Sequence, residues 1–141
     1  MKRLMLSVVL MLAFSQVQAH CFNYAAQKFN VDEDILRAIA KVESGYNANA
    51  VNVNKNHSVD LGLMQINSIH VPKLSKAGIK MEDLLEPCTN VIVGAWLLRD
   101  SIDRANGDLW RGVGYYHSAT PRFYLSYISK VKKAFATNNQ G

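Results

Sequence analysis

Metal-ligand spacings, internal repeats and long apolar runs are all scarce in this sequence. Two cysteines and four histidines occur in 141 residues, and they show neither HxxxH nor CxxC spacing, which argues against a metal site. No repeat, low-complexity tract or linker interrupts residues 21–135. The dense basic cluster of Lys130, Lys132 and Lys133 comes without a nucleic-acid-binding motif. Metalloproteins, repeat proteins and nucleic-acid-binding proteins are therefore disfavoured.

The longest apolar run lies at the N-terminus, where residues 1–19 have the pattern of a secretory signal. A basic start is followed by an apolar stretch from Leu4 to Phe14 and a small-residue exit at Ala19. The stretch is shorter than the roughly 20 residues that span a bilayer. We therefore expect an exported chain with a cleaved signal, no transmembrane segment afterwards, and one domain over residues 20–141.

The exported part of the chain is modestly basic. The formal net charge of the whole sequence is +5, and it falls to +3 when Lys2 and Arg3 leave with the signal, which holds no acid. A charge of this size suits a polyanionic partner such as a cell-wall polymer, although it is also ordinary for a small soluble domain. Charge alone therefore does not identify a partner.

The two cysteines are Cys21 and Cys88. In an exported chain of this size their simplest interpretation is a disulfide, and the alternative is a pair of buried free thiols. A disulfide would close a loop of about 70 residues, which the chain-entropy relation values at about 4 kcal/mol. We expect it to tie the start of the mature chain to its middle.

Most of the remaining sequence has helical periodicity. The first such segment begins with Asp32 as a cap. A longer segment ends at Gly107, a suitable helix stop, and the last opens with Thr120 as cap and Pro121 in the first helical position. The four predicted helices cover residues 31–43, 89–107, 108–116 and 120–135.

Residues 50–67 have a different pattern. Val51 and Val53 alternate with polar residues, a polar turn follows at residues 54–58, and apolar residues then surround Gly62. This pattern predicts a short, irregular hairpin or extended lobe. The expected fold class is therefore α+β and mostly helical, with a small β lobe that follows the first predicted helix.

The acid near the end of that helix, Glu43, falls on its apolar face. The same face carries Leu36, Ile39 and Ala40. A carboxyl group held against apolar side chains is disfavoured in its charged form, so its pKa should rise toward neutrality, as a general acid requires. The alternative is a solvated glutamate at a fraying helix end. We treat Glu43 as the candidate catalytic acid.

A second segment, "GLMQIN" at residues 62–67, could line a binding groove. Gly62 permits close backbone approach, and the amides of Gln65 and Asn67 can both donate and accept hydrogen bonds. Amides beside the apolar Met64 suit a sugar, which offers hydroxyl groups together with apolar ring faces. Taken alone, such a segment is more often a strand end that leads into a helix.

Together these motifs resemble a known family. "ESGYN" at residues 43–47, "GLMQIN" and the aromatic "GYYHSATP" at residues 114–121 are similar in order and spacing to the soluble lytic transglycosylases, which cut bacterial peptidoglycan. The resemblance covers residues 21–135. The short, exported form most resembles the specialised members that accompany type III and type IV secretion systems, conjugation machines and type IV pili.

The resemblance implies a lysozyme-like fold, a periplasmic location and no metal or organic cofactor. It implies peptidoglycan strands as substrate and components of an envelope-spanning apparatus as partners. In this family one glutamate, which corresponds to Glu43, protonates the glycosidic oxygen between N-acetylmuramic acid and N-acetylglucosamine. The same carboxylate then acts as base on the C6 hydroxyl, which attacks C1 and leaves a 1,6-anhydro product without addition of water.

Other substrate-binding positions follow from the same resemblance. Ser44 corresponds to the serine after the family's catalytic acid, and it either binds substrate or stabilises the turn. Met64, Gln65 and Asn67 are expected to line the groove. Tyr116 corresponds to the tyrosine of the family's Tyr-Asn-Ala-Gly pattern, whose hydroxyl can form a hydrogen bond near the acid. The sequence departs from that pattern at His117, which replaces the asparagine.

Asp60, in the predicted lobe, raises the question of a second catalytic carboxylate. Lysozyme pairs a helix acid with an aspartate of its β lobe, whereas typical soluble lytic transglycosylases lack this partner. If Asp60 faced Glu43, the enzyme could hydrolyse the same bond as a muramidase; otherwise Asp60 supports the lobe. A non-catalytic peptidoglycan-binding or structural assembly module is a further alternative.

Overall fold

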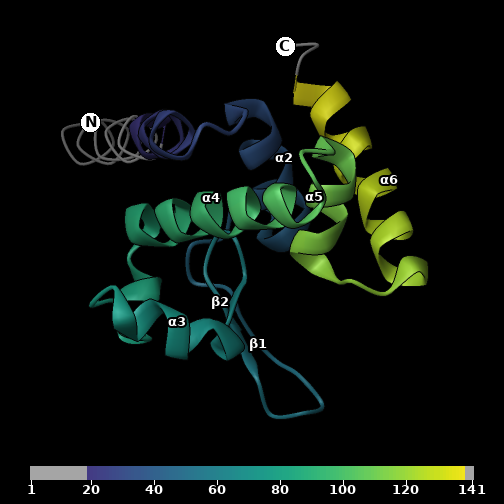
Figure 1. Ribbon diagram of the computed structural model, residues 1–141. Helices are drawn as coiled ribbons and strands as arrows, with labels where there is room; N and C mark the ends of the chain where they lie inside the picture. The colour runs from purple at the N-terminus through teal and green to yellow at the C-terminus, as the bar shows by residue number, and fades with distance from the viewer. Residues whose placement is uncertain (1–18, 139–141) are drawn as a thin grey trace, which may run out of the picture.

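The computed structural model of the protein describes residues 19–138. Residues 19–29 are helical, and the elements that follow are helices and one small sheet (Figure 1). The α-helices are α2 (Glu33–Ser44), α3 (Val71–Lys76), α4 (Pro87–Arg104), α5 (Leu109–His117) and α6 (Pro121–Asn138). The strands are β1 (Val51–Val53), β2 (Val59–Leu61) and β3 (Ile66–Asn67), and 3-10 turns lie at Ser68–His70 and Glu82–Leu85. The expected mostly helical α+β class is confirmed.

The predicted signal, residues 1–19, lies outside the described residues except for Ala19. The signal and the start of the domain at His20 therefore stay predictions. Within residues 19–138, no helix combines the length and the apolar character needed to cross a membrane.

Helix α4 crosses the middle of the molecule (Figure 1). Strands β1 and β2 project from one side of it, α5 packs at its C-terminal end, and α6 packs against α5. Helix α2 packs mainly against α6. The apolar faces of these helices meet in one core, as their sequence periodicity predicts; its fully buried members include Leu36, Ile39, Val91, Leu98, Val113 and Val131.

The caps of α2 fix the position of Glu43 in its last turn. At the start, the carboxylate of Asp32 accepts a hydrogen bond from the backbone N–H of Ile35 at 3.0 Å, as predicted. At the end, Gly45 has a left-handed backbone with φ 60°, and its N–H donates to the carbonyl of Lys41 at 3.0 Å. This glycine closes the helix because such a backbone costs it little.

Helix α4 begins earlier and ends earlier than its sequence pattern predicts. It starts at Pro87, where Glu86 serves as cap by accepting hydrogen bonds from the backbone N–H groups of Cys88 and Thr89. It ends at Arg104, and Gly107 (φ 84°) donates its N–H back to the carbonyl of Ile102 at 2.9 Å. The predicted stop residue therefore closes the turn beyond the helix.

The hairpin predicted in residues 50–67 is confirmed, and a third strand extends it. Strands β1, β2 and β3 pair antiparallel in that order. The register places Asp60 of β2 opposite Asn52 of β1 and opposite Asn67 of β3. The sequence did not predict β3 or α3, because two-residue and six-residue elements are too short to show a period.

The predicted disulfide between Cys21 and Cys88 is confirmed. It joins the helix at residues 19–29 to the first turn of α4, with 5.2 Å between the two Cα atoms. This separation lies within the usual range for disulfides. The bridge links positions 67 residues apart in the sequence.

Candidate active site

A groove of about 1800 Å³ runs between the small sheet and the helices. Side chains of α2, α4, α5 and all three strands line it, together with Phe123 near the start of α6. Seven residues that the sequence marked as site candidates lie in its wall: Glu43, Ser44, Asp60, Gln65, Asn67, Tyr116 and His117. Residues up to 74 positions apart in the chain thus meet in one place, as the motif spacing predicted.

Glu43 is half-buried and lines this groove. The pKa of its carboxyl group is raised from an ordinary 4.5 to about 7, mainly by burial. Within this net shift, a hydrogen bond from Tyr127 and the positive charge of Lys130 lower the pKa, whereas the nearby negative charge of Asp60 raises it. Near neutral pH the carboxyl group therefore exists in both protonation states, so it can act as acid and as base.

Tyr127 holds the carboxyl group of Glu43. Its phenolic hydroxyl donates to Oε1 of Glu43 at 2.6 Å, and its ring is buried between α6 and the core. Burial, together with the neighbouring Glu43, raises the pKa of Tyr127 well above its ordinary value. The hydroxyl therefore stays protonated, and remains a donor, near neutral pH.

Tyr127 is a site residue that the sequence analysis did not mark. It is buried in α6, but its hydroxyl also belongs to the site. The available signal was the polar tip of a tyrosine on a buried face, because such a hydroxyl needs a hydrogen-bond partner. The sequence does not show that this partner is Glu43.

Four hydrogen bonds from three helices hold the backbone of residues 61–64 beside Glu43. Within α4, the buried side chain of Asn90 accepts from the N–H of Met64 at 2.8 Å and donates to the carbonyl of Leu61 at 2.7 Å. From α2, the hydroxyl of Ser44 donates to the carbonyl of Leu63 at 2.8 Å. The fourth bond comes from Tyr116 of α5, which donates to the carbonyl of Met64 at 2.8 Å.

Gly62 is required where this backbone meets Asn90. Its φ is 75°, and a Cβ atom built there would lie 2.3 Å from Nδ2 of Asn90. The close approach predicted for this glycine is therefore confirmed. The sequence analysis did not mark Asn90 as a site residue. The pattern that could have indicated it is a lone amide on an otherwise apolar helix face, one turn before Gly94.

The expectation that the side chain of Met64 lines the groove is wrong. Met64 is 0% exposed, and its side chain packs against Gly94 of α4, where an added Cβ would lie 2.7 Å from Cγ of Met64. Only its backbone carbonyl is directed to the site, where it accepts from Tyr116. Apolar burial outweighs exposure to the groove at this position because a close-packed core surrounds it.

Gln65, one of the two amide residues of the "GLMQIN" segment, forms hydrogen bonds within the lobe. Gln65 has a left-handed backbone, and its side chain donates to the carbonyls of Ala50 at 3.2 Å and Gly62 at 3.0 Å. It lines the groove while also fixing the loop that leads into β3. Its contribution to substrate binding stays a prediction.

Asp60 lies in the same groove, and amide groups surround its carboxylate. Asn67 donates to Oδ1 at 2.6 Å, while Asn54 and Asn52 donate to Oδ2 at 2.8 Å and 3.3 Å. These three amides come from both neighbouring strands and from the hairpin turn. Asp60 thus organises the lobe while contributing a negative charge close enough to raise the pKa of Glu43.

His117, the residue that departs from the family pattern, ends α5 and contacts Tyr127. Its imidazole stacks on the Tyr127 ring with 4.6 Å between centroids and an angle of 5° between planes. Partial burial and the positive charge of Lys130 lower the pKa of His117, while Asp60 acts in the opposite direction. His117 is therefore connected to Glu43 indirectly, through the ring and hydroxyl of Tyr127.

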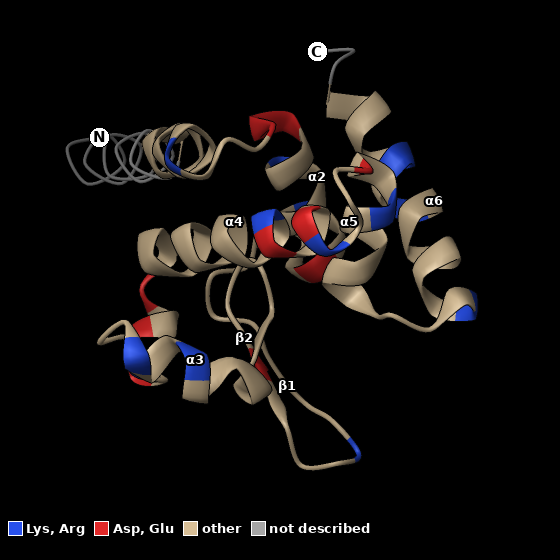
Figure 2. Ribbon diagram, viewed as in Figure 1, with Lys and Arg blue, Asp and Glu red and all other residues tan. Residues whose placement is uncertain are grey.

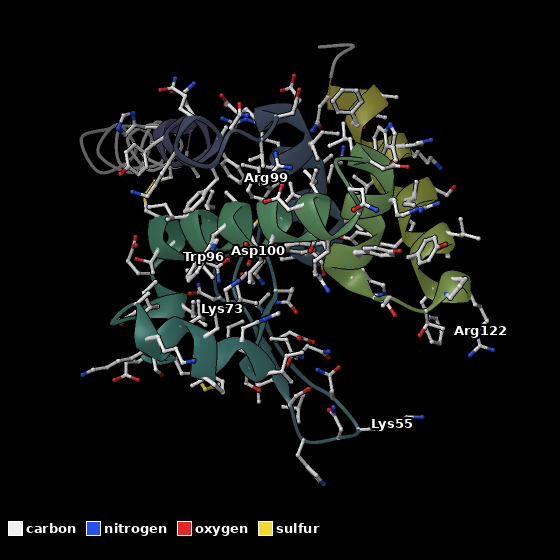
Figure 3. The ribbon with its side chains drawn as sticks, in the orientation of Figure 1. Lys55, Lys73, Trp96, Arg99, Asp100 and Arg122 are labelled. Carbon is white, nitrogen blue, oxygen red and sulfur yellow. A yellow bond between two sulfur atoms is a disulfide. The ribbon has the colours of Figure 1, made fainter. Side chains whose placement is uncertain are left out.

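Charged residues are unevenly distributed over the helices (Figure 2). Helix α6 carries Arg122 and a cluster of lysines, among them Lys130, but no acid. At the α3 side, Lys73 forms an ion pair with Asp100 of α4 and lies over the ring of Trp96, 4.6 Å from its centroid (Figure 3). These contacts join α3 to α4 and cover a face of Trp96, which packs against the core.

Among residues 19–138, no group of three or more histidine, cysteine or acidic side chains lies close enough together to hold a metal ion. The chemistry of the groove rests on the carboxyl, hydroxyl, amide and imidazole groups described above.

Comparison with known proteins agrees with this geometry. Residues 20–137 match the family model described as the transglycosylase SLT domain. Invasion protein IagB of Salmonella typhimurium is 41% identical over 114 residues, which cover 80% of this chain and 71% of that protein. Protein IpgF of Shigella flexneri is 40% identical over 104 residues, covering 73% of this chain and 68% of IpgF. An X polypeptide of Escherichia coli is 38% identical over 143 residues, and the match covers 96% of this chain and 84% of that protein.

Among solved structures, the lytic transglycosylase Slt of Pseudomonas aeruginosa, determined as an inactive mutant, matches with a TM-score of 0.68 and 18% identity. The match covers 86% of this chain and 24% of the Slt chain. At this identity the likeness shows the fold, which is that of the lytic transglycosylases. Because the family match spans most of its length, this chain belongs to the transglycosylase SLT family of peptidoglycan lytic transglycosylases. Its substrate places its action in the cell envelope.

Proposed function

We propose that the enzyme cleaves the β-1,4 bond between N-acetylmuramic acid and N-acetylglucosamine, and that Glu43 is its single acid and base. One observation carries the proposal: a carboxyl group with a pKa of about 7 lines the groove and is held by the hydroxyl of Tyr127. A group with this pKa is present in both protonation states under physiological conditions.

Both proton transfers use this carboxyl group. Tyr127 fixes Oε1, so Oε2 is left to face the glycosidic oxygen. The protonated acid gives its proton to that oxygen as the bond to C1 breaks, and N-acetylglucosamine leaves with a free hydroxyl. The resulting carboxylate takes the proton of the muramic C6 hydroxyl while O6 bonds to C1. The product is 1,6-anhydro-N-acetylmuramic acid, and Glu43 is again protonated without uptake of water.

Hydrolysis by Glu43 and Asp60 together is the second candidate, because Asp60 lies in the same groove and raises the pKa of Glu43. The hydrogen bonds from Asn52, Asn54 and Asn67 favour a supporting role for Asp60 instead. A carboxylate that already accepts from three amides is less available to stabilise a sugar cation or to orient water. We therefore assign Asp60 to the support of the lobe.

Mass spectrometry of digested, purified sacculi distinguishes the two reactions. We expect muropeptides that end in anhydro-muramic acid, which are lighter by one water than the hydrolysis products. Products with only water-added reducing ends would establish hydrolysis instead. No release of muropeptides by the parent enzyme, with the Glu43→Gln variant binding sacculi equally well, would support the non-catalytic binding module.

We further propose that the enzyme acts in the periplasm, where it opens the wall locally for a secretion system, conjugation machine or pilus. The signal pattern in residues 1–19 supports export, and a relative named as an invasion protein supports a role beside an envelope apparatus. Deletion of the gene should reduce assembly of the apparatus. Complementation should succeed with the parent gene and fail with Glu43→Gln; rescue by the inactive variant would exclude wall cleavage as the contribution.

A further inference from the structure

Three aromatic contacts join α5 to α6, and they differ in geometry. Two meet edge to face, at interplanar angles of 83° and 80°. The third is flat, with an angle of 5°, and its centroids are closer than those of the other two pairs. In order along α5 the pairs are Trp110 with Phe135, Tyr115 with Tyr124, and His117 with Tyr127.

The flat pair is the one that reaches the catalytic acid. The hydroxyl of Tyr127 donates to Oε1 of Glu43 at 2.6 Å, and the imidazole of His117 lies parallel to the Tyr127 ring. A phenolic oxygen sits at the far end of its ring, so a small tilt of the ring out of its plane displaces the oxygen. A parallel neighbour resists that tilt, because the two rings are stacked with nearly parallel planes.

We propose that His117 is a positioning residue for the reaction: its ring, stacked on Tyr127, keeps the phenol directed at Glu43 and so holds the catalytic carboxyl group in place. The inference rests on the proposed function of Glu43. In this role His117 does not contact the carboxyl group or the reacting atoms. It acts through Tyr127, and a displacement of about 1 Å at a catalytic group can reduce a rate by up to about a hundredfold.

The surroundings of His117 favour the neutral imidazole that this role requires. Lys130 of α6 and partial burial lower its pKa, and Asp60 of β2 is the opposing acid across the groove. Glu43 and Tyr127 face it from α2 and α6. A neutral ring stacks on the phenol without adding a charge beside Glu43. The pKa of Glu43 is therefore determined by burial, Tyr127, Asp60 and Lys130.

The test is a double-mutant cycle read out as release of anhydro-muropeptides from purified sacculi. We expect His117→Ala to lower kcat by about tenfold or more and to leave KM within about twofold, because orientation is lost and not binding. His117→Phe, which keeps a flat ring, should restore most of kcat. In a Tyr127→Phe background, which lacks the hydroxyl, His117→Ala should cause little further loss.

Phe135→Ala is the matched control, since it removes another aromatic contact between the same two helices at a position outside the groove. It should lower thermal stability without the loss of kcat. If His117→Ala does not fold, His117→Leu replaces it, because leucine fills a similar volume without a flat face.

Three results would overturn the inference. The first is full activity of His117→Ala or His117→Leu, and the second is no recovery of kcat in His117→Phe. The third is a loss of kcat from His117→Ala that is as large in the Tyr127→Phe background as in the parent enzyme. These differ from failure of the proposed function itself. In that case the parent enzyme would release no anhydro-muropeptides, and Glu43→Gln would behave like the parent.

Discussion

Asn67 of β3 lies directly opposite Asp60 of β2, and its side-chain amide donates to Oδ1 of Asp60 at 2.6 Å. The pairing continues on the other side of Asp60, where Asn52 of β1 is its partner in the register and a second donor. A single carboxylate therefore links all three strands of the lobe. The same group raises the pKa of Glu43 through its negative charge.

Replacement of this carboxylate should affect the lobe and the acid in different ways. In Asp60→Asn an amide faces three donor amides, so we expect a loss of about 1–3 kcal/mol in the free energy of unfolding. Removal of the negative charge lowers the pKa of Glu43, so the alkaline limb of the pH–rate profile should move to lower pH. The products should remain anhydro-muropeptides.

Calorimetry, a pH–rate profile and mass spectrometry of the products check these three expectations. Asp34→Asn, at an exposed site in the first turn of α2, is the control for loss of one negative charge. A collapse of turnover in Asp60→Asn with an unchanged melting temperature would instead make Asp60 a catalytic partner. Unchanged activity would dispose of the two-carboxylate mechanism.

Loss of the Tyr127 hydroxyl should disturb the acid itself. The hydrogen bond from Tyr127 lowers the pKa of Glu43, so in Tyr127→Phe that pKa should rise above its present value of about 7. We expect the alkaline limb of the pH–rate profile to move to higher pH, with a lower kcat because the carboxyl group loses its orientation. Tyr124→Phe, one turn earlier in α6, is the control, and a pH profile that did not separate the two variants would contradict this role.

The raised pKa of Glu43 also makes stability depend on pH. The folded protein holds this proton up to about pH 7, whereas the ordinary value is 4.5. Between these values the folded state binds more protons than the unfolded state, so the free energy of unfolding falls as pH rises. Above about pH 7 the full penalty, about 3 kcal/mol by this relation, is present.

Glu43→Gln removes both the penalty and the catalyst. We expect this variant to be more stable than the parent at pH 8 by about 3 kcal/mol and to differ little from it at pH 4. Cleavage of the wall should be abolished, which a zymogram tests directly, and the fold should be intact. Clearing of peptidoglycan at the parental level would remove Glu43 from the mechanism, and equal stability at pH 8 would contradict the raised pKa.

Asn90 should matter for both stability and activity, although it does not touch the substrate groove. Asn90→Ala leaves the N–H of Met64 and the carbonyls of Leu61 and Leu84 without their buried partner. We expect a loss of about 3 kcal/mol or more in the free energy of unfolding. Chemical denaturation measures it, with the exposed Asn23→Ala as control; a loss no larger than that of the control would show that other groups hold this backbone.

The parts of the site that the sequence predicts are those within one segment. Glu43 was assigned from its place on an apolar stripe, and Gly62 from its lack of a side chain in the "GLMQIN" segment; both are local patterns. The contact of Glu43 with Tyr127 joins positions 84 residues apart, and no period in either helix encodes it. Asn90 was missed for the same reason, because its partners come from other segments of the chain.

Met64 shows the limit of a motif as evidence. Its position beside Gln65 is correct, and the backbone there does approach Tyr116, but the side chain turns into the core against Gly94. A motif specifies which residues lie near the site, whereas the direction of each side chain depends on the space that neighbouring elements leave. Here the absence of a side chain at Gly94 leaves room in α4, and the methionine fills it.

Hydrogen bonds from α2, α4 and α5 hold the backbone of residues 61–64. This backbone is therefore fixed to the helical part of the molecule, although it comes at the end of strand β2. Within residues 19–138, the hairpin tip at residues 54–58 has no such hydrogen bonds to the α-helices; its bonds stay within the lobe. We therefore expect the side of the groove formed by α2, α4 and α5 to be rigid and the hairpin side to be movable. Glycan strands that carry bulky peptides would then be accommodated by the hairpin, while Glu43 keeps its position on the rigid side.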